Sequence, residues 1–458
     1  HELRDVNGDY PEFSTGTVKM GNATLSSKGY AVPAYSYLRK FGDFSMWDIY
    51  RAELPLYSLI TPKMSGEMMQ SLVQMYKEGG WMPIFPCWNS YTAAMIGDHS
   101  GAALADAYVK GIRNFDAAKA YEGMRLNAFS TPYLAKDYRD GKGRRAIRSY
   151  MDNGYIPLED MVEEAFHTNE QTSRTLEYAY DDYAVAQMAK ALHDSCQDAA
   201  LRQKYLEDYN DLMRRSENWR NVINPATGWA DGRYENGKWE NNEDLVHRKS
   251  YITEGATCHY TWYVPQNPEG LFEVIRNSKP MDKQEKQIEK MERKMEKKGE
   301  TPVRNEKVIA RLDKMFDNGW YWHGNEPCHQ VAYLYDAAGA PEKTQERVHH
   351  ILQTEYNDTP GGLSGNDDAG QMSAWYVFSS IGFYPVCPGT PYYYIGTPSF
   401  DKVTLNLENG RKFILSADRQ HMDDYLIQSV TLNGKPLADY RLSHQQILSG
   451  GELHFQMK

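Results

Sequence analysis

The chain has 458 residues, 41% of them hydrophobic and 25% charged; this is ordinary globular usage and excludes a disordered, collagen-like or disulfide-built chain. Its formal net charge of -11 at pH 7 would repel a phosphate backbone or an anionic membrane surface, so we expect no nucleic-acid partner. No window approaches the roughly 18 consecutive apolar residues that span a bilayer, so we expect no membrane insertion.

The region from Trp47 to about Thr354 is predicted to be helical. Its apolar residues recur at three- and four-residue spacing, which is typical of amphipathic helices packed on a core. The clearest predicted helices cover residues 64–78, 101–115, 176–193 and 200–222. Many helices joined by loops of variable length suggest a toroid of paired helices, in which the loops at one end build the site.

A run of charged residues from 279 to 300 interrupts this helical region. Its few apolar residues, Ile288, Met291 and Met295, fall at helical spacing, which predicts a solvated helix with one narrow apolar stripe. We interpret the run as an insertion. A partner-binding role is the alternative, although a solvated face is the commoner meaning of such a run.

After Pro388 the pattern changes to short alternating segments rich in β-formers, at residues 392–395, 402–407, 412–415, 427–432 and 453–455. Asn409-Gly410 and Asn433-Gly434 are typical hairpin turns. We therefore divide the chain into a helical part, 1–387, and a small β unit, 388–458. Few strands bury too little surface to be stable alone, so this unit should pack on the helical part or complete another sheet.

Three acidic clusters lie in loop-like, aromatic surroundings, and they are centred on Glu254, Glu326 and Asp368. Glycosidic cleavage needs one acid that protonates the departing oxygen and another that activates water or attacks the sugar. The alternative interpretation is that Asp and Glu beside glycine are caps and turn formers. The oxygen ligands of the second and third clusters would also suit a hard cation such as calcium.

Taken in chain order, these clusters resemble glycoside hydrolase family 92, the calcium-dependent exo-acting α-mannosidases. The resemblance also rests on earlier motifs, at residues 44–51, 86–88, 95–99, 154–157 and 175–182. It implies a mainly α fold, namely an (α/α)6 barrel preceded by an N-terminal β-sandwich. Because this sequence begins almost at the barrel, we expect that sandwich to be absent from it and the C-terminal β unit to pack on the barrel or on the missing sandwich.

The resemblance also assigns roles to individual residues. It implies hydrolysis of terminal α-mannosidic bonds in a single, inverting displacement, with Glu254 as general acid and Asp368 as general base, assisted by Asp367 or Asn366. The implied calcium lies near Asn325, Glu326 and Asp368. The implied sugar-binding residues are Trp88, Asp98 and His99 around the terminal sugar, His323 at the entrance where the next sugar lies, and Asp48 and Glu326.

The implied partner is a mannose-containing oligosaccharide or glycoprotein glycan, and the implied location is secreted or periplasmic, with attachment to the cell surface as a variant. We expect a monomer or a weak oligomer. The chain departs from the family pattern at His259-Tyr260 and at Gln266-Asn267, where the family commonly has Gln-Tyr and His-Asp. Two alternatives therefore stay open: a glycan-binding homologue without turnover, and an (α/α)6 glycosidase for another sugar.

Overall fold

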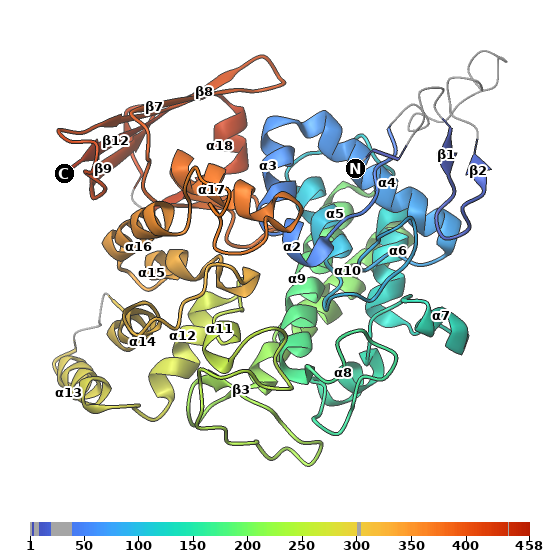
Figure 1. Ribbon diagram of the computed structural model, residues 1–458, viewed down its shortest axis with the longest axis horizontal. Coiled ribbons are helices and arrows are strands. Elements are labelled where there is room, and N and C mark those ends of the chain that lie inside the picture. The colour runs from blue at the N-terminus through green and yellow to red at the C-terminus, as the bar shows by residue number, and fades with distance from the viewer. Residues whose placement is uncertain (1, 4–8, 20–38, 300–303, 438) are drawn as a thin grey trace.

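The computed structural model describes residues 2–3, 9–19, 39–299, 304–437 and 439–458 (Figure 1). Most of the described chain before Gly382 is helical. The α-helices are α2 (Met46–Ile49), α3 (Glu53–Ile60), α4 (Pro62–Gly79), α5 (His99–Val109), α6 (Ala117–Phe129), α7 (Ala135–Arg139), α8 (Ile147–Asn153), α9 (Gln171–Ser195), α10 (Ala199–Arg215), α11 (Thr257–Tyr260), α12 (Pro268–Asn277), α13 (Lys283–Lys297), α14 (Glu306–Asp317), α15 (Leu334–Ala337), α16 (Pro341–Thr354), α17 (Gln371–Ile381) and α18 (His444–Leu448). The part of the chain that the structure describes also contains the short 3-10 helices η1 (Asn218–Asn221), η2 (Glu326–Cys328), η3 (Val331–Tyr333) and η4 (Asp368–Gly370).

The helices form the ring of pairs expected for an (α/α)6 barrel. In the first half, α9 packs against α5, α6 and α10, and in the second half α12 packs against α14 and α15 against α16. The ring closes where α17 packs on α3, so the two ends of the helical region lie side by side. This closure brings loops from distant parts of the sequence to a common centre.

The predicted helices are confirmed, with shifted ends for two of them. Helices α4 and α9 cover the predicted segments 64–78 and 176–193. Helix α5 ends at Val109 rather than at residue 115, because Gly111 adopts a left-handed backbone with φ 95° that a continuing helix cannot contain. The segment 200–222 divides into α10 and the short helix η1.

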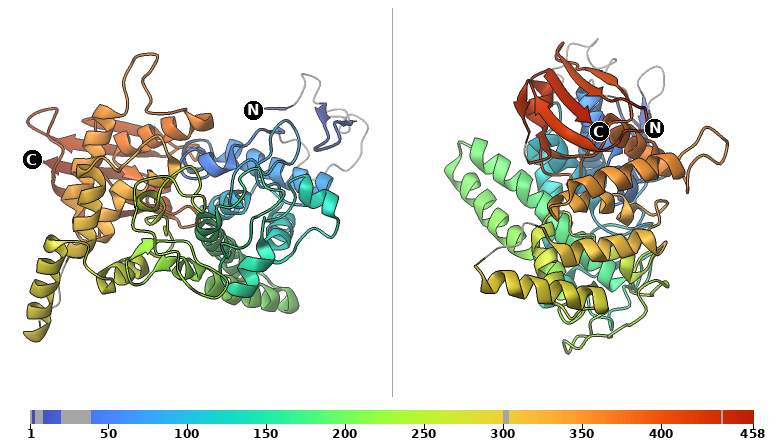
Figure 2. Two further views of the ribbon diagram at one scale, coloured as in Figure 1. Left: turned by 60° about the horizontal axis from the view of Figure 1, so that its bottom comes forward. Right: turned by 90° about the vertical axis from the view of Figure 1, so that its left-hand side faces the viewer.

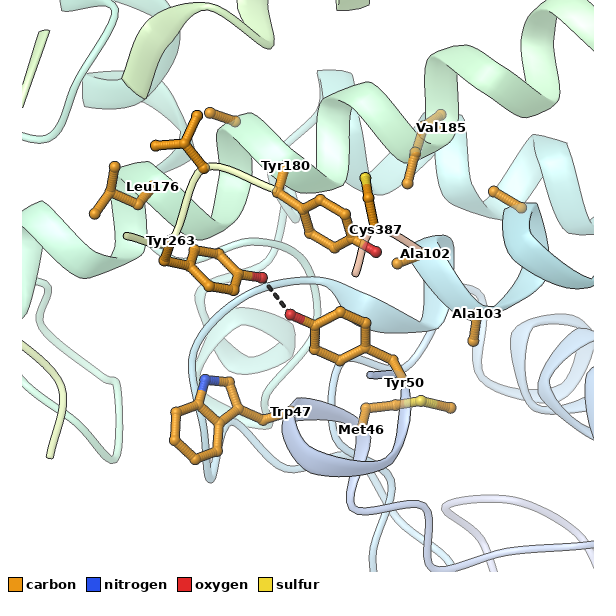
Figure 3. Packing of buried hydrophobic residues seen from close by; sticks show 14 of the residues in the cluster. Met46, Trp47, Tyr50, Ala102, Ala103, Leu176, Tyr180, Val185, Tyr263 and Cys387 are labelled. Atoms are coloured by element: carbon orange, nitrogen blue, oxygen red, sulfur yellow. Dashed lines mark hydrogen bonds between the residues drawn. The ribbon is translucent and has the colours of Figure 1, made fainter. Parts of the chain in front are cut away.

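Helix α9 is the central element of the barrel. Its residues from Gln171 to Asp182 are all buried, including several acidic ones. Figure 3 shows Tyr180 of α9 beside Tyr50 and Tyr263, whose hydroxyl groups hydrogen-bond to each other. The barrel interior is therefore lined with aromatic rings that carry polar tips, and such groups stay buried only when those tips find partners.

The C-terminal strands form a small β unit, as predicted. The strands of the described residues are β1 (Tyr10–Pro11), β2 (Val18–Lys19), β3 (Ile223–Asn224), β4 (Trp229–Ala230), β5 (Phe383–Tyr384), β6 (Tyr392–Ile395), β7 (Lys402–Asn406), β8 (Lys412–Asp418), β9 (Ile427–Leu432), β10 (Lys435–Pro436), β11 (Arg441–Ser443) and β12 (Gly451–Met457). The larger sheet has the order β10-β9-β12-β8-β7, in which only β12 and β8 run parallel, and the smaller has the order β11-β6-β5.

Both predicted hairpins are present, between β7 and β8 and between β9 and β10. Phe413, Leu453 and Phe455 of the larger sheet belong to one buried cluster with Leu56 of α3 and Phe378 of α17. The β unit therefore packs on the barrel. Among the described residues, no helix combines the length and the apolar character that crossing a bilayer needs.

Candidate active site

The three acidic clusters meet at the centre of the barrel because glycines let their loops touch. A Cβ atom at Gly324 would lie 2.3 Å from the carbonyl oxygen of Ser364, and one at Gly365 would lie 3.2 Å from the Cα atom of Gly324. The loop of Glu254 is joined to the loop of Glu326 by Asn325, whose Nδ2 donates a hydrogen bond to the carbonyl oxygen of Glu254 at 3.2 Å. A larger residue at Gly324 would force two of the loops apart.

Three carboxylates form a compact cluster at this junction. Asp48 of α2, Glu326 of η2 and Asp368 of η4 place one oxygen each within 4.8 Å of one another. Asp48 and Glu326 are 6% and 3% exposed. The family resemblance implied that Asp48 binds sugar. No local sequence pattern connects Asp48 with the distant loops of Glu326 and Asp368.

The cluster is electrostatically costly without a cation. Burial raises the pKa of Glu326, and the nearby charges of Asp48 and Asp368 raise it further. Burial likewise raises the pKa of Asp48, and the negative charges of Asp368 and Glu254 raise it further. Like charges in a buried site oppose joint ionisation, so these residues either share protons or bind a positive ion.

The available oxygen atoms fit a hard cation. Among the described atoms, Oδ1 of Asn325 and Oε1 of Glu326 are buried and have no hydrogen-bond partner. Carboxylate and amide oxygens are the ligands that calcium prefers. Two of the three predicted metal ligands, Glu326 and Asp368, therefore lie in the cluster, and the third, Asn325, supplies an unused oxygen next to Glu326.

The two predicted catalytic residues share an unusual backbone conformation. Glu254 has φ 50° and Asp368 has φ 49°, both in the left-handed region that residues with a side chain rarely adopt. Such strain persists only where the surrounding structure enforces it, and it concentrates at functional sites. The side chain of Glu254 is 43% exposed, so it can reach a bound molecule, whereas Asp368 is half-buried.

Glu254 also has a histidine neighbour that the sequence did not indicate. Nε2 of His167 lies 4.0 Å from Oε1 of Glu254, and Nδ1 lies 3.0 Å from Oε1 of Glu170. Glu170 in turn accepts a hydrogen bond from the hydroxyl of Thr253, the residue before Glu254, at 2.5 Å. This arrangement holds the loop of Glu254, and no spacing rule connects residues this far apart in the chain.

The remaining residues of the third cluster differ in what they do locally. Oδ1 of Asp367 accepts hydrogen bonds from the backbone nitrogen and the hydroxyl of Ser373, at 3.0 and 2.8 Å. Asp367 therefore holds the first turn of α17 beside Asp368. Asn366 is exposed on the same loop.

The predicted sugar-binding residues are split between exposed and buried positions. Trp88 is 83% exposed and has φ 52°, and its backbone nitrogen donates to Asp43 at 2.6 Å. Asp98 is 1% exposed and is enclosed by Asn127 and Arg144, at 3.0 and 2.9 Å. Trp88 can contact a ligand directly, whereas Asp98 can act only through the residues that it holds.

His99, the first residue of α5, pairs with two buried carboxylates of α9. It is 1% exposed, it contacts Glu177 through Nε2, and its Nδ1 lies 2.8 Å from Asp181. Burial lowers the pKa of His99, but the charges of Asp181 and Glu177 outweigh burial and raise it to about 9. Oε1 of Glu177 also accepts hydrogen bonds from Trp47 and Tyr260, both at 3.0 Å. His99 therefore acts as a buried cation beneath the site.

His323 is 1% exposed and lies beneath the surface rather than at an entrance. Its two ring nitrogens are 2.7 Å from the hydroxyls of Tyr321 and Tyr356. Burial and the neighbouring His329 lower the pKa of His323 well below its ordinary value. It is a neutral residue that positions aromatic side chains.

Comparison with known proteins identifies the family of this chain. The sequence model of the "Glycosyl hydrolase family 92 catalytic domain" matches residues 5–458. A family GH92 α-mannosidase from Bacteroides thetaiotaomicron superposes with a TM-score of 0.80 at 31% identity, covering 100% of this chain and 53% of that one, and it has also been solved with mannoimidazole. A family GH92 inverting mannosidase from the same organism gives a TM-score of 0.80 at 31% identity, with 100% and 57% covered.

A curated protein of Arthroderma benhamiae, named "Uncharacterized secreted glycosidase", is 29% identical over 439 residues, which are 89% of this chain and 50% of that protein. The chain thus spans about half the length of each of these relatives.

Proposed function

The chain belongs to glycosyl hydrolase family 92, and from that premise we propose that it is an exo-acting α-mannosidase that removes terminal α-linked mannose from an oligosaccharide or a glycoprotein glycan. The observation that carries the proposal is the meeting of the Glu254 loop with the buried cluster of Asp48, Glu326 and Asp368. The solved relatives are mannosidases, which supports mannose as the sugar.

In the proposed reaction, Glu254 gives its proton to the glycosidic oxygen as the bond from that oxygen to the anomeric carbon breaks. Asp368 takes a proton from a water molecule, whose oxygen forms the new bond to the anomeric carbon from the opposite face. Asp367 and Asn366 assist on the same loop. The single displacement inverts the anomeric centre, and it requires about 6.5–9.5 Å between the two carboxyl groups in the substrate complex.

The proposed cofactor is calcium, held by Asp48, Glu326 and Asp368 with Oδ1 of Asn325. When bound, it would supply positive charge that stabilises the polarised sugar hydroxyls without any proton transfer. Trp88 offers an exposed aromatic face to the terminal sugar. Asp98, His99 and His323 are buried and position the side chains that surround the sugar.

The proposed location is secreted or periplasmic, with attachment to the cell surface as a variant. The name of the curated relative as a secreted glycosidase supports export. We propose a monomer or a weak oligomer.

The departures at Gln266 and Asn267 do not favour a binding protein without turnover. Oδ1 of Asn267 accepts a hydrogen bond from the backbone nitrogen of Gly270 at 2.9 Å and so caps α12. Nε2 of Gln266 donates to the carbonyl oxygen of Ser216 at 3.2 Å. Both residues thus serve local structure, which leaves the carboxylates of the site unaltered.

The test is mannose release from α1,2-, α1,3-, α1,4- and α1,6-linked mannobioses, with calcium and with excess chelator, followed by NMR. Calcium-dependent release of β-mannose is expected, and the mannobiose that is cleaved would identify the linkage. Release of α-mannose would contradict inversion. Binding of mannosides without release, by the protein together with any domain that completes it, would favour the glycan-binding alternative, and activity only on another sugar would favour the second alternative.

A further inference from the structure

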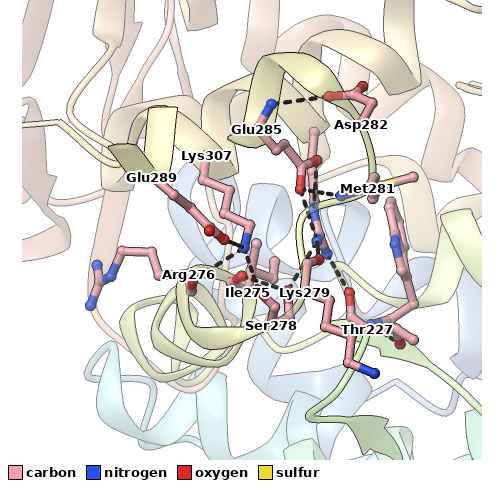
Figure 4. A network of polar contacts seen from close by, with 12 residues as sticks. Thr227, Ile275, Arg276, Ser278, Lys279, Met281, Asp282, Glu285, Glu289 and Lys307 are labelled. Carbon is pink, nitrogen blue, oxygen red and sulfur yellow. Dashed lines mark hydrogen bonds and ion pairs between the residues drawn. The ribbon is translucent and has the colours of Figure 1, made fainter. Parts of the chain in front are cut away.

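Helix α13 is fixed to the outside of the barrel. It lies at the outer edge of the molecule, next to α14 (Figure 2). Its acidic residues hold it there: Glu285 is buried and pairs with Arg311 at 3.2 Å, and Glu289 pairs with Lys307 at 2.8 Å (Figure 4). These ion pairs attach the helix firmly to α14 and its neighbours. Glu300, at the end of the predicted charge run, lies outside the described residues.

The charges of α13 are separated by sign around its axis. At about 100° per residue, the basic residues fall within an arc of about 100°. They form what we call the basic strip, which consists of Lys283, Lys286, Lys290, Arg293, Lys294 and Lys297, all exposed. The inward side carries Glu285 and Glu289. The solvated helix of the sequence prediction is confirmed, but among the side chains that the structure describes, its outer face carries basic residues.

The lysines of the basic strip are available to a partner. Among the side chains that the structure describes, none forms an ion pair with these five lysines, and Arg293 is 77% exposed and lies 3.8 Å from Glu289. A solvated helix usually interleaves both signs, because pairs four residues apart stabilise it. The positive surface continues into a groove of about 480 Å³ that Arg276, Lys279 and Arg293 line together with Glu289 and Glu292.

We propose that the basic strip docks the protein on the surface of an anionic lipid bilayer. Its six charges form a straight row about 20 Å long, which matches a flat array of phosphate groups better than a single ion. The peripheral position of α13 lets a plane reach the strip, and Met291, 63% exposed beside it, adds an apolar contact. The net charge of -11 does not prevent this contact, because charges beyond about 8–10 Å are screened.

The experiment is sedimentation of the protein with phosphatidylcholine vesicles, with and without phosphatidylglycerol, at low and high salt. The protein should bind the anionic vesicles only, and salt should weaken binding. Replacement of Lys286, Lys290, Lys294 and Lys297 by Gln should reduce binding at least about tenfold. This experiment uses no sugar substrate, so its outcome is independent of the proposed enzymatic activity.

The matched control replaces the dispersed exposed lysines Lys204, Lys238, Lys402 and Lys435 by Gln, which changes the net charge equally. It should bind anionic vesicles within about twofold of the natural protein, since membrane attraction is local. An equal loss in this control, or no binding of the natural protein, overturns the proposal. Binding to soluble heparin without binding to vesicles would also overturn it and would identify a linear polyanion as the partner.

Discussion

The side-chain amide of Asn325 donates a hydrogen bond to the backbone carbonyl oxygen of Glu254, 3.2 Å away. Asn325 directly precedes Glu326 of the carboxylate cluster, and Glu254 has a left-handed backbone. One side chain thus links the loop of the proposed general acid to the proposed calcium site, and ordering of the cluster positions the acid.

Asn325→Ala should therefore lower kcat/KM for mannobiose by about 10- to 100-fold, the usual cost of losing a residue that orients a metal site. Calcium affinity, measured by titration calorimetry, should fall with it. The matched control is Asn409→Ala, which removes a similar hydrogen bond to the carbonyl oxygen of Leu448 far from the site. Equal activity of the two variants would contradict the link.

The roles of the two catalytic carboxyls can be separated by the leaving group. Glu254→Gln should lower kcat on mannobiose by about 10²- to 10⁴-fold but should spare α-mannosyl fluoride, because fluoride departs without a proton. Asp368→Asn should lower both rates, since each reaction needs an activated water. The assays use saturating calcium, with exposed Glu243→Gln as the control. If Asp368→Asn spared the fluoride and Glu254→Gln did not, Asp368 would be the general acid and Glu254 the general base.

Calcium should change how stability depends on pH. Burial and like charges raise the pKa values of Glu326 and Asp48, so without calcium the folded state binds more protons than the unfolded chain once pH exceeds the ordinary carboxyl range. The free energy of unfolding should then fall as pH rises toward neutrality. Saturating calcium should remove this fall and raise Tm, which thermal unfolding measures. A Tm that calcium leaves unchanged at neutral pH would argue against the site.

His99 predicts a second pH window, at higher pH. Its pKa is raised to about 9 in the folded state, against about 6.5 when unfolded. Its contribution to stability is therefore complete below about pH 6.5 and is lost as pH rises through about 9. In saturating calcium, denaturant unfolding between pH 6 and pH 10 should show this loss.

His99→Gln should remove that window and cost about 3–5 kcal/mol at pH 6, because Glu177 and Asp181 lose a buried partner. The control is His193→Gln, which removes a histidine pair with Asp194 at the surface and should cost little. A His99 variant with unchanged pH dependence would show that the ion pair does not set it.

Trp88 should contribute to sugar binding and little to folding. Because it is 83% exposed, Trp88→Ala should leave Tm nearly unchanged while raising KM about 3- to 10-fold through loss of an aromatic contact. Tyr133→Ala, at a residue that is 99% exposed, is the control. An unchanged KM would exclude Trp88 from the sugar site.

The sequence alone determined the local elements, and it indicated which carboxylates to propose for the reaction. Apolar spacing located α4 and α9, and the turn pairs at Asn409 and Asn433 located two hairpins, because these signals act between near neighbours in the chain. The motifs around Glu254, Glu326 and Asp368 suggested these carboxylates for the proposed reaction, since glycosidic cleavage requires a pair of acidic groups.

Only the tertiary structure decided which residues share a site. The closure of α17 on α3 brings Asp48 to Glu326 and Asp368. Asp98, His99 and His323 are each 1% exposed, because residues from other parts of the chain enclose them. The contact of His167 with Glu254 likewise joins distant loops. Burial and electrostatic coupling depend on distances through space, and periodicity along the chain carries no information about them.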